Sequence, residues 1–347
     1  MKILFRADCH RNIGTGHIFR CRGMADYFKG EGWDIQFLIN DYEFSEKVVR
    51  GYDYKKVVFD CIKDEIKETK DILGKNSFDI IVVDFYEKCE NDELMSVFAS
   101  HAKQGVLAIT DDFKKVNIKA DFVIASDPNQ TEYDYTSDKQ IVLCGEKYSL
   151  VSPEFIKNKI EVKDKVENVL ISFGGHDPYN VTHQVAKHII SASLAHDLSE
   201  VTFNFLIGGI YRHEEELREL LDNSGLKWKF HKDLKSVLPL FLENDMAITA
   251  CGNILSELCH LNVPQICIGL NERQNEVGLV LHKKNLIEYA GYYADIRQEA
   301  FNAIFLKLLN SYEERSSLHD RCAEHFSLDP LREIYLIMKG EGNEFKR

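Results

Sequence analysis

The amino-acid sequence predicts an α/β protein built from two doubly wound, parallel sheets. Short, nearly all-apolar segments alternate with amphipathic segments along almost the whole chain, and the pattern begins again at "NVLISFGG", residue 168. Strands that are covered on both faces are apolar in this way, and repeated βα alternation favours parallel sheets. The length of 347 residues fits two domains of roughly 150 to 170 residues each.

Each half of the chain supplies its own set of expected strands. Those of the first half are residues 2–8, 33–39, 55–60, 79–85, 105–111 and 121–127. Those of the second half are residues 168–175, 201–209, 226–232, 245–252 and 264–269. Helices are expected between them, for example at 17–29, 91–103 and 253–261.

The loss of apolar segments at residues 151–165 predicts a charged linker there. We assign 1–150 to an N-terminal Rossmann-like domain and 166–347 to a C-terminal Rossmann-like domain with a terminal helix. That helix follows "SLDP" and is expected to pack back across the first domain. Two such domains face a cleft, and ligands bind beyond the carboxyl ends of the strands.

Composition narrows the class of partner. A net charge of −13 argues against a broad nucleic-acid or membrane surface, because such partners favour basic faces. The N-terminal apolar run is too short for a signal peptide, and no segment approaches the ~20 apolar residues of a membrane helix. We expect a cytoplasmic protein with a small-molecule substrate. The nine cysteines form no C-x-x-C pair, so reduced thiols are expected instead of a zinc site.

The first strand-to-helix junction, "RADCHRNIGTGHIFRC", places His17 behind Gly14 and Gly16 and ahead of a predicted helix. Glycines let a substrate approach the backbone closely, and the first turn of a helix attracts anions. The positive end of the helix favours a neutral imidazole, the form that a general base needs near pH 7. The alternative is a histidine that merely caps the helix or packs under the loop.

The second junction is "SFGGHDPYNVT". Gly174 and Gly175 end a strand, and Asp177 can cap the helix that follows. These features explain a loop that holds no ligand. They also suit a pyrophosphate cradled by backbone donors, with Asn180 beside it. The two interpretations stay open.

The third junction is "TACGNILSE", followed by "NERQNE". Gly252 ends a strand, Asn253 begins the predicted helix, and Glu257 lies one turn further on the same face. A carboxylate there can accept both hydroxyls of a ribose, although a solvated glutamate is the plainer alternative. Arg273 and Gln274 follow the next strand, where they can reach a sugar or a phosphate.

Polar residues at two further strand ends are candidates for lining the cleft or forming turns: Asp84 and Tyr86 in "VVDFY", and Asp111 and Asp112 in "ITDDF". The chain lacks the motifs D-x-D, H-E-x-x-H, G-x-x-x-x-G-K-[ST] and G-x-S-x-G. Metal-bound nucleotide chemistry, zinc proteolysis, P-loop hydrolysis and α/β-hydrolase chemistry therefore lose their usual support.

In this order the motifs resemble a family of hydrolases in pseudaminic-acid synthesis, which act on UDP-2,4-diacetamido-2,4,6-trideoxy-β-L-altropyranose, and the related spore-coat polysaccharide synthesis proteins. The similar segments are "RADCHRNIGTGHIFRC", "VVDFY", "ITDDF", "CGEKYSLVSPEF", "SFGGHDPYNVT" and "ACGNILSE…NVPQICI…ERQNE". They run from about residue 3 to residue 290.

The resemblance implies a GT-B fold and inverting cleavage of the anomeric C–O bond by water, with release of UDP and without a metal or other cofactor. It implies that His17 is catalytic, that Tyr86 lies at the substrate and that Glu257 binds ribose. Gly14, Gly16 and Arg20 belong to the His17 motif and are expected to contact substrate, together with Asp84. Helix termini would then stabilise the departing diphosphate.

The chain departs from the family pattern at two places. Ser152 replaces an arginine, which affects only the linker, and Arg273 precedes Gln274 where the family has Asn-Gln, which leaves the sugar open. The alternatives to hydrolysis are a GT-B glycosyltransferase with a UDP-sugar donor and a binding protein that has lost its chemistry. A monomer or a weak oligomer is expected.

Overall fold

The computed structural model describes residues 1–9, 16–85, 88, 91–110, 118–129 and 140–341. It divides into two units, and each is described by itself. The first comprises Met1–Pro153 and Leu328–Arg347, and the second comprises Glu154–Ser327.

The first unit contains a sheet of seven strands in the order β3-β2-β1-β4-β5-β6-β7. Every recorded strand pair in it is parallel. The strands are β1 (Lys2–Ala7), β2 (Asp34–Asn40), β3 (Asp53–Val57), β4 (Phe78–Asp84), β5 (Ala102–Thr110), β6 (Phe122–Ala125) and β7 (Ile141–Cys144). The order reverses between β1 and β4, as in a doubly wound fold.

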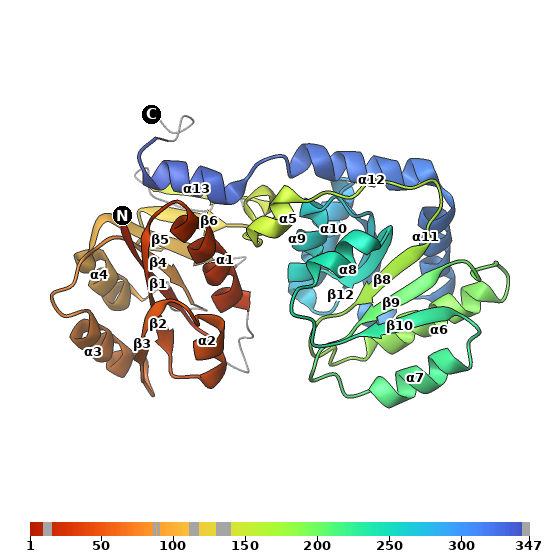
Figure 1. The fold of residues 1–347 in the computed structure, drawn as a ribbon, viewed down its shortest axis with the longest axis horizontal. Coiled ribbons are helices and arrows are strands. Elements are labelled where there is room, and N and C mark those ends of the chain that lie inside the picture. Colours follow the sequence, from red (N-terminus) through yellow and green to blue (C-terminus); the bar gives the residue numbers. More distant parts are fainter. Residues whose placement is uncertain (10–15, 86–87, 89–90, 111–117, 130–139, 342–347) are drawn as a thin grey trace. The chain divides into compact units, whose positions relative to one another are not determined.

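Helices cover both faces of this sheet (Figure 1). They are α1 (Gly16–Gly30) and α2 (Glu43–Val48) on one face, and α3 (Ile62–Leu73) and α4 (Asp92–His101) on the other. A short 3-10 helix, η3 (Glu146–Tyr148), follows β7. The apolar residues of β4, such as Ile81 and Val83, pack against α3 and α4 in one buried cluster.

The second unit contains six strands in the order β10-β9-β8-β11-β12-β13, again with parallel pairs. They are β8 (Asn168–Ser172), β9 (Thr202–Leu206), β10 (Lys227–His231), β11 (Met246–Ala250), β12 (Gln265–Gly269) and β13 (Glu288–Tyr292). The order reverses between β8 and β11. Each unit therefore has its own reversal point, where ligands of such sheets bind.

Two helical layers cover the second sheet (Figure 1). α6 (Val181–Ser193), α7 (Glu214–Asp222) and α11 (Gln298–Asn310) share the larger apolar cluster. α9 (Asn253–His260), α10 (Glu272–Lys283) and α12 (Tyr312–His325) share a cluster on the opposite face. The remaining helices are α5 (Pro153–Lys157), α8 (Leu238–Glu243) and the 3-10 helix η4 (Tyr293–Asp295).

The division between the units differs from the expected one. Residues 154–165 belong to the second unit, although a linker was expected at 151–165. The buried Arg315 explains this, because its guanidinium donates to the carbonyls of Lys163 and Asp164 at 2.9 Å each. The amide of Ile160 also donates to the carbonyl of Leu261 at 3.0 Å. A distant arginine therefore attaches the expected linker to the second unit.

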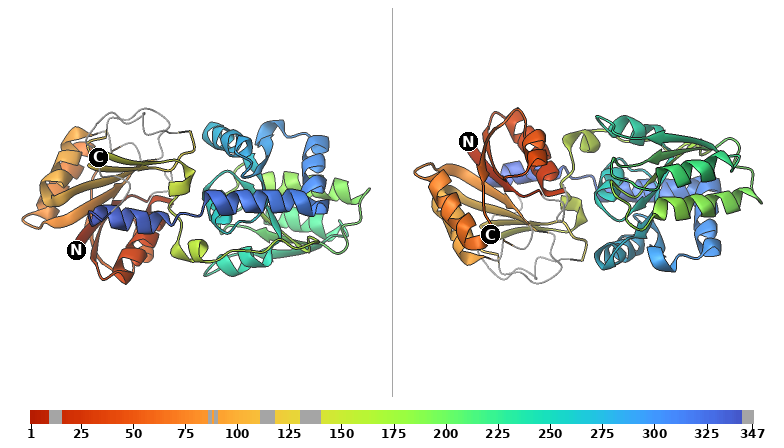
Figure 2. Two further views of the ribbon diagram at one scale, coloured as in Figure 1. Left: turned by 90° about the horizontal axis from the view of Figure 1, so that it is seen from above. Right: turned by 90° about the horizontal axis from the view of Figure 1, so that it is seen from below.

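The terminal helix α13 (Pro330–Met338) was expected in the C-terminal domain, residues 166–347. The structure places it in the first unit. Tyr335 packs on Trp33 with ring centroids 5.0 Å apart and on Phe28 at 6.3 Å. α13 thus lies beside α1 (Figure 2). The expectation that this helix packs across the first domain is confirmed.

Candidate active site

The side chains of His17 and Asp84 meet at the reversal point of the first sheet. His17 is the second residue of α1, and Asp84 is the last residue of β4, which pairs with β1. His17 Nδ1 lies 2.7 Å from Asp84 Oδ1. A carboxylate at a strand end and a histidine at the start of a helix therefore form one pair where doubly wound sheets bind ligands.

Arg20 binds the same carboxylate from the next turn of α1. It donates from Nε to Oδ2 at 2.5 Å and from a terminal nitrogen to Oδ1 at 2.6 Å. Complete burial alone would raise the pKa of Asp84, but Arg20, and after it His17, outweigh that effect and hold the pKa at about 2. Asp84 is therefore an anion at neutral pH, and an anionic carboxylate accepts hydrogen bonds only.

This charge state decides the tautomer of His17. A terminal nitrogen of Arg20 also lies 3.1 Å from Nδ1, but the shorter contact of 2.7 Å is to an anion that can only accept, so we assign the proton to Nδ1. Nε2 then carries no proton and can act as a base. A carboxylate placed in this way orients the imidazole and stabilises the imidazolium that forms when Nε2 takes up a proton. The side chain of His17 keeps 12% of its surface exposed.

A second charged cluster, which the sequence did not predict, lies next to this pair. Buried Arg6 donates to Asp8 at 2.6 Å and to Glu65 at 2.5 Å, and Lys88 contacts the same two carboxylates at 2.7 and 2.8 Å. The backbone amide of Asp8 lies 3.4 Å from the carbonyl of Asp84. The signal in the sequence is Arg6 inside the apolar strand "KILFRAD".

The junction after β8 holds its own carboxylate. Asp177 is buried and accepts from the amides of Val181 and Thr182 at 2.9 and 2.8 Å, so it caps α6 as expected. Asn180 accepts from the hydroxyl of Tyr211 at 2.7 Å. The first two amides of α6 are thus occupied and do not offer their hydrogens to a phosphate.

That turn needs glycine for steric reasons. Gly174 has a φ of 83°, which favours glycine. A Cβ at Gly208 would lie 2.2 Å from the backbone of Gly175. The backbone segments after β8 and β9 therefore approach each other directly.

The junction after β11 brings together residues expected to bind a nucleotide and a sugar. Gly252 precedes α9 and supplies no capping side chain, so the first turn of α9, which begins at Asn253, has no side-chain cap from that residue. Gln274 Nε2 lies 3.6 Å from the point where a Cβ of Gly252 would stand. The Oε1 atom of Gln274 accepts from the amide of Leu270 at 3.0 Å. Arg273 lies beside Gln274 in the first turn of α10.

Glu257 lies one turn into α9, at the same junction. Its side chain is partly buried, and burial, followed by repulsion from Glu154, raises its pKa to about 8. A carboxyl group in this state is neutral near pH 7 and ionises when hydrogen-bond donors approach it. The carboxyl group of Glu257 can therefore ionise when the hydroxyls of a ribose donate hydrogen bonds to it.

Several expected residues lie outside the part of the chain that the structure describes: Gly14, Tyr86, Asp111 and Asp112. Gly16 is the first residue of α1. The structure therefore brings His17, Arg20 and Asp84 together in the first unit, and Gly252 and Gln274 together in the second.

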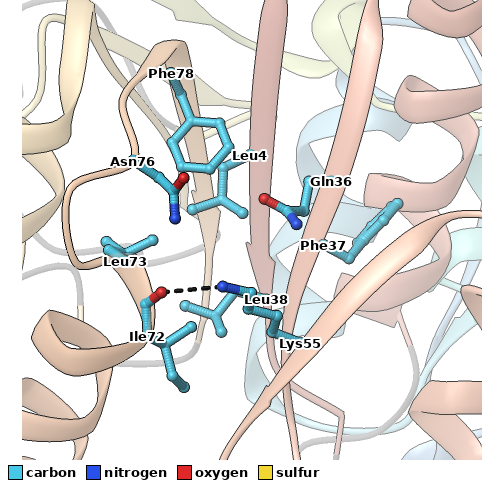
Figure 3. A pocket seen from close by; sticks show the side chains of 9 residues that line it. All are labelled: Leu4, Gln36, Phe37, Leu38, Lys55, Ile72, Leu73, Asn76 and Phe78. Carbon is cyan, nitrogen blue, oxygen red and sulfur yellow. Dashed lines mark hydrogen bonds between the residues drawn. The ribbon is translucent and has the colours of Figure 1, made fainter.

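A small cavity between β1, β2 and the end of α3 is not a ligand site (Figure 3). Its volume of about 10 Å³ is near the minimum for one water molecule. Apolar side chains such as Leu4 and Phe78 line it, and Lys55 donates across its edge to the carbonyl of Ile72 at 3.1 Å. Within the described residues, no group of three His, Cys, Asp or Glu side chains can hold a metal ion, and no helix is long and apolar enough to cross a membrane.

No family model matches the chain. An uncharacterized protein of Methanocaldococcus jannaschii is 26% identical over 291 residues, 80% of this chain and 57% of that protein. A UDP-2,4-diacetamido-2,4,6-trideoxy-beta-L-altropyranose hydrolase of Campylobacter jejuni is 25% identical over 190 residues, 54% of this chain and 66% of that protein. The matches thus span less than two thirds of either relative.

Solved structures match over nearly the full length. MurG of Acinetobacter baumannii has a TM-score of 0.71 at 12% identity, with 98% of this chain and 99% of that chain covered. A UDP-N-acetylglucosamine 2-epimerase, described as putative, from Listeria monocytogenes has a TM-score of 0.69 at 9% identity, with 100% and 98% covered. The calicheamicin glycosyltransferase CalG4 has a TM-score of 0.62 at 11% identity, with 99% of each chain covered. The two parallel-sheet units therefore form a GT-B fold, as expected from the sequence.

Proposed function

We propose that this protein is an enzyme that hydrolyses the anomeric C–O bond of a UDP-sugar with inversion. The proposed substrate is UDP-2,4-diacetamido-2,4,6-trideoxy-β-L-altropyranose or a close analogue, within nonulosonic-acid or surface-polysaccharide synthesis. The observation that carries the proposal is the contact of 2.7 Å between His17 Nδ1 and Asp84 Oδ1 at a reversal point of a GT-B fold. The distant similarity to the Campylobacter hydrolase supports the choice of substrate.

In the proposed reaction, water is the nucleophile. His17 Nε2 removes a proton from water while the oxygen bonds to the anomeric carbon, and the bond from that carbon to the phosphate oxygen breaks. Asp84 stabilises the imidazolium, and Arg20 keeps Asp84 ionised. The amides at the start of α9 would stabilise the developing negative charge of UDP.

The nucleotide is proposed to bind in the second unit. Glu257 would accept the ribose hydroxyls, while Gly252 and Asn253 would meet the diphosphate. Gln274 and Arg273 would contact the sugar. Gly174 and Gly175 would add backbone contacts, with Asp177 and Asn180 shaping the loop around them. No metal ion or other cofactor is part of this proposal.

The test is a proton NMR time course with UDP-2,4-diacetamido-2,4,6-trideoxy-β-L-altropyranose and no acceptor. We expect UDP and the free sugar of inverted anomeric form, and a loss of at least ~100-fold in rate for His17→Ala. His101→Ala is the matched control, because His101 lies in the same unit, outside the proposed site, and contacts the carbonyls of Val97 and Gly74 and the hydroxyl of Ser100. An intact substrate with folded, UDP-binding protein would reject hydrolysis of this sugar.

Glycosyl transfer is the second candidate, and one observation favours it. Phe19 and Phe44, on α1 and α2, are 51% and 37% exposed and pack edge to face at 6.1 Å. Exposed aromatic side chains of this kind can contact an apolar acceptor. In that case UDP release would depend on an added acceptor such as an octyl glycoside, and Phe19→Ser would weaken it without changing UDP binding.

A further inference from the structure

An open groove lies between α10 and β13 in the second unit. Its volume is about 510 Å³. Glu272, Asn275 and Leu279 line it from α10, and Tyr289, Tyr292 and Asp295 line it from β13 and η4. Positions 272, 275 and 279 share one face of the helix. Gln274, whose side chain points to Gly252, lies on another face, so the groove is separate from the proposed nucleotide site.

The tyrosines that line the groove contact neighbouring side chains of the second unit. Tyr292 packs edge to face on Tyr293 with ring centroids 4.8 Å apart, and Tyr293 stacks on Tyr179 at 4.1 Å and 19°. At the other end, the Tyr289 hydroxyl donates to Asn275 Oδ1 at 2.7 Å. A ring fixed in this way loses little conformational entropy when a ligand binds.

The strand that lines the groove is irregular. β13 is an edge strand whose partners on β12 shift between Cys267, opposite Tyr289, and Ile268, opposite Gly291. Ala290 is the extra residue of this bulge, and Gly291 has a φ of 112°. Bulges redirect side chains and discourage the addition of another strand. The groove therefore suits a compact ligand and not an extended peptide.

The charge of the groove disfavours a phosphate ligand. Glu272 and Asp295 are exposed carboxylates, and within the described residues no ion pair is recorded for either. No lysine, arginine or histidine is among the lining residues. Two negative charges without a cation repel nucleotides and accept hydrogen bonds from hydroxyl groups.

We propose that this groove binds a neutral pyranose sugar, separately from the catalytic site. The C–H face of the ring would pack on Tyr292, because aromatic faces are negative and attract polarised C–H groups. Glu272 and Asp295 would accept from sugar hydroxyls, and the amide nitrogen of Asn275 would donate to a hydroxyl or acetamido oxygen. This inference does not depend on which reaction the enzyme catalyses.

The test is saturation-transfer NMR on the full chain with methyl β-glucoside and methyl N-acetyl-β-glucosaminide. We expect saturation of protons on one face of the sugar and weak, millimolar binding. Tyr292→Ala should weaken binding by on the order of 10-fold, since it removes the aromatic surface. Tyr312→Ala is the matched control, because Tyr312 is a 41% exposed tyrosine on α12.

The second arm adds saturating UDP, which should leave the sugar signal unchanged. Loss of the signal with UDP would place the sugar at the proposed nucleotide site and overturn the inference. Binding of spermidine but of neither sugar would identify a cation site and overturn it as well. A signal that survives Tyr292→Ala, or no binding by folded protein, would also contradict it. UDP-sugar cleavage is measured separately, so failure of the proposed function leaves this result unaffected.

Discussion

Asp84 Oδ1 lies 2.7 Å from His17 Nδ1, and because this carboxylate is anionic we assign the imidazole proton to Nδ1. The two residues are 67 positions apart in the chain. They meet because β4 pairs with β1, and α1 follows β1 in the chain. The fold thus converts a strand end and a helix start into one acid–base pair.

Asp84→Asn should lower kcat by about 10³- to 10⁴-fold, because the amide can donate to Nδ1 and favour the wrong tautomer of His17. The measurement is the rate of UDP release, with the imidazole of His17 followed by NMR. Asp26→Asn serves as the control, since Asp26 pairs with Arg22 in an exposed position of α1, the helix that carries His17. An unchanged kcat for Asp84→Asn would contradict the role of the pair.

The same carboxylate should contribute to stability in a pH-dependent way. Its pKa of about 2 in the folded protein lies below the ordinary value of 3.8. The contribution is therefore complete above pH 3.8 and is lost as the pH falls toward 2. At about 1.4 kcal/mol per pKa unit, it amounts to about 2 kcal/mol. The measurement is urea unfolding of the native protein and of Asp84→Asn from pH 7 to pH 3. The difference between their free energies of unfolding should become smaller only near pH 3.

Glu257 should make UDP binding depend on pH between pH 7 and pH 9. With a pKa of about 8, the carboxyl is mostly neutral at pH 7, whereas two ribose hydroxyls bind the ionised form best. UDP should therefore bind about 10-fold more tightly at pH 9 than at pH 7. Calorimetry in buffers of different ionisation enthalpy should also detect proton release on binding.

Two variants check this assignment. Glu257→Gln should bind UDP weakly and with no pH dependence across this range. Glu154→Gln removes the repulsion that helps to raise the pKa of Glu257, so it should bind UDP more tightly than the native protein at pH 7. Equal affinity of Glu154→Gln and the native protein would show that this repulsion has no effect on binding.

The sequence predicted the fold well where strands are central. Segments such as "DIIVVDF" are apolar because both faces are covered, and β4 occupies Phe78–Asp84 as expected for 79–85. β7 and β13 were missed, although the other two edge strands, β3 and β10, were expected at 55–60 and 226–232. The residues of β13, "EYAGY", are all partly exposed, so no apolar run marks the strand.

The sequence predicted the residues of the site one by one, but not the contacts between their side chains. His17 follows a glycine-containing loop, and Asp84 ends an apolar strand, so both carry local signals. Their pairing depends on strand order, which local patterns do not encode. Glu65 had no signal at all, because it lies in "IKDEIKETKD", a segment with the charge pattern of an exposed helix.

Glu65 provides a further prediction about stability. Four charged groups balance one another in its cluster: Arg6 and Lys88 are positive, and Asp8 and Glu65 are negative. Glu65→Gln keeps the shape of the side chain but leaves one buried positive charge uncompensated. Breaking a buried ion pair by removing one partner costs about 3–5 kcal/mol. Urea unfolding should therefore show a loss of this size.

Lys88→Met should restore part of the stability lost in Glu65→Gln, because the double variant again has equal numbers of positive and negative charges. The thioether side chain also keeps contact with Phe59, over which the Lys88 ammonium lies at 4.0 Å. Asp71→Asn on the exposed side of the same helix α3 is the control and should change little. If the double variant is less stable than Glu65→Gln alone, hydrogen bonding by Lys88, and not charge balance, holds this cluster together.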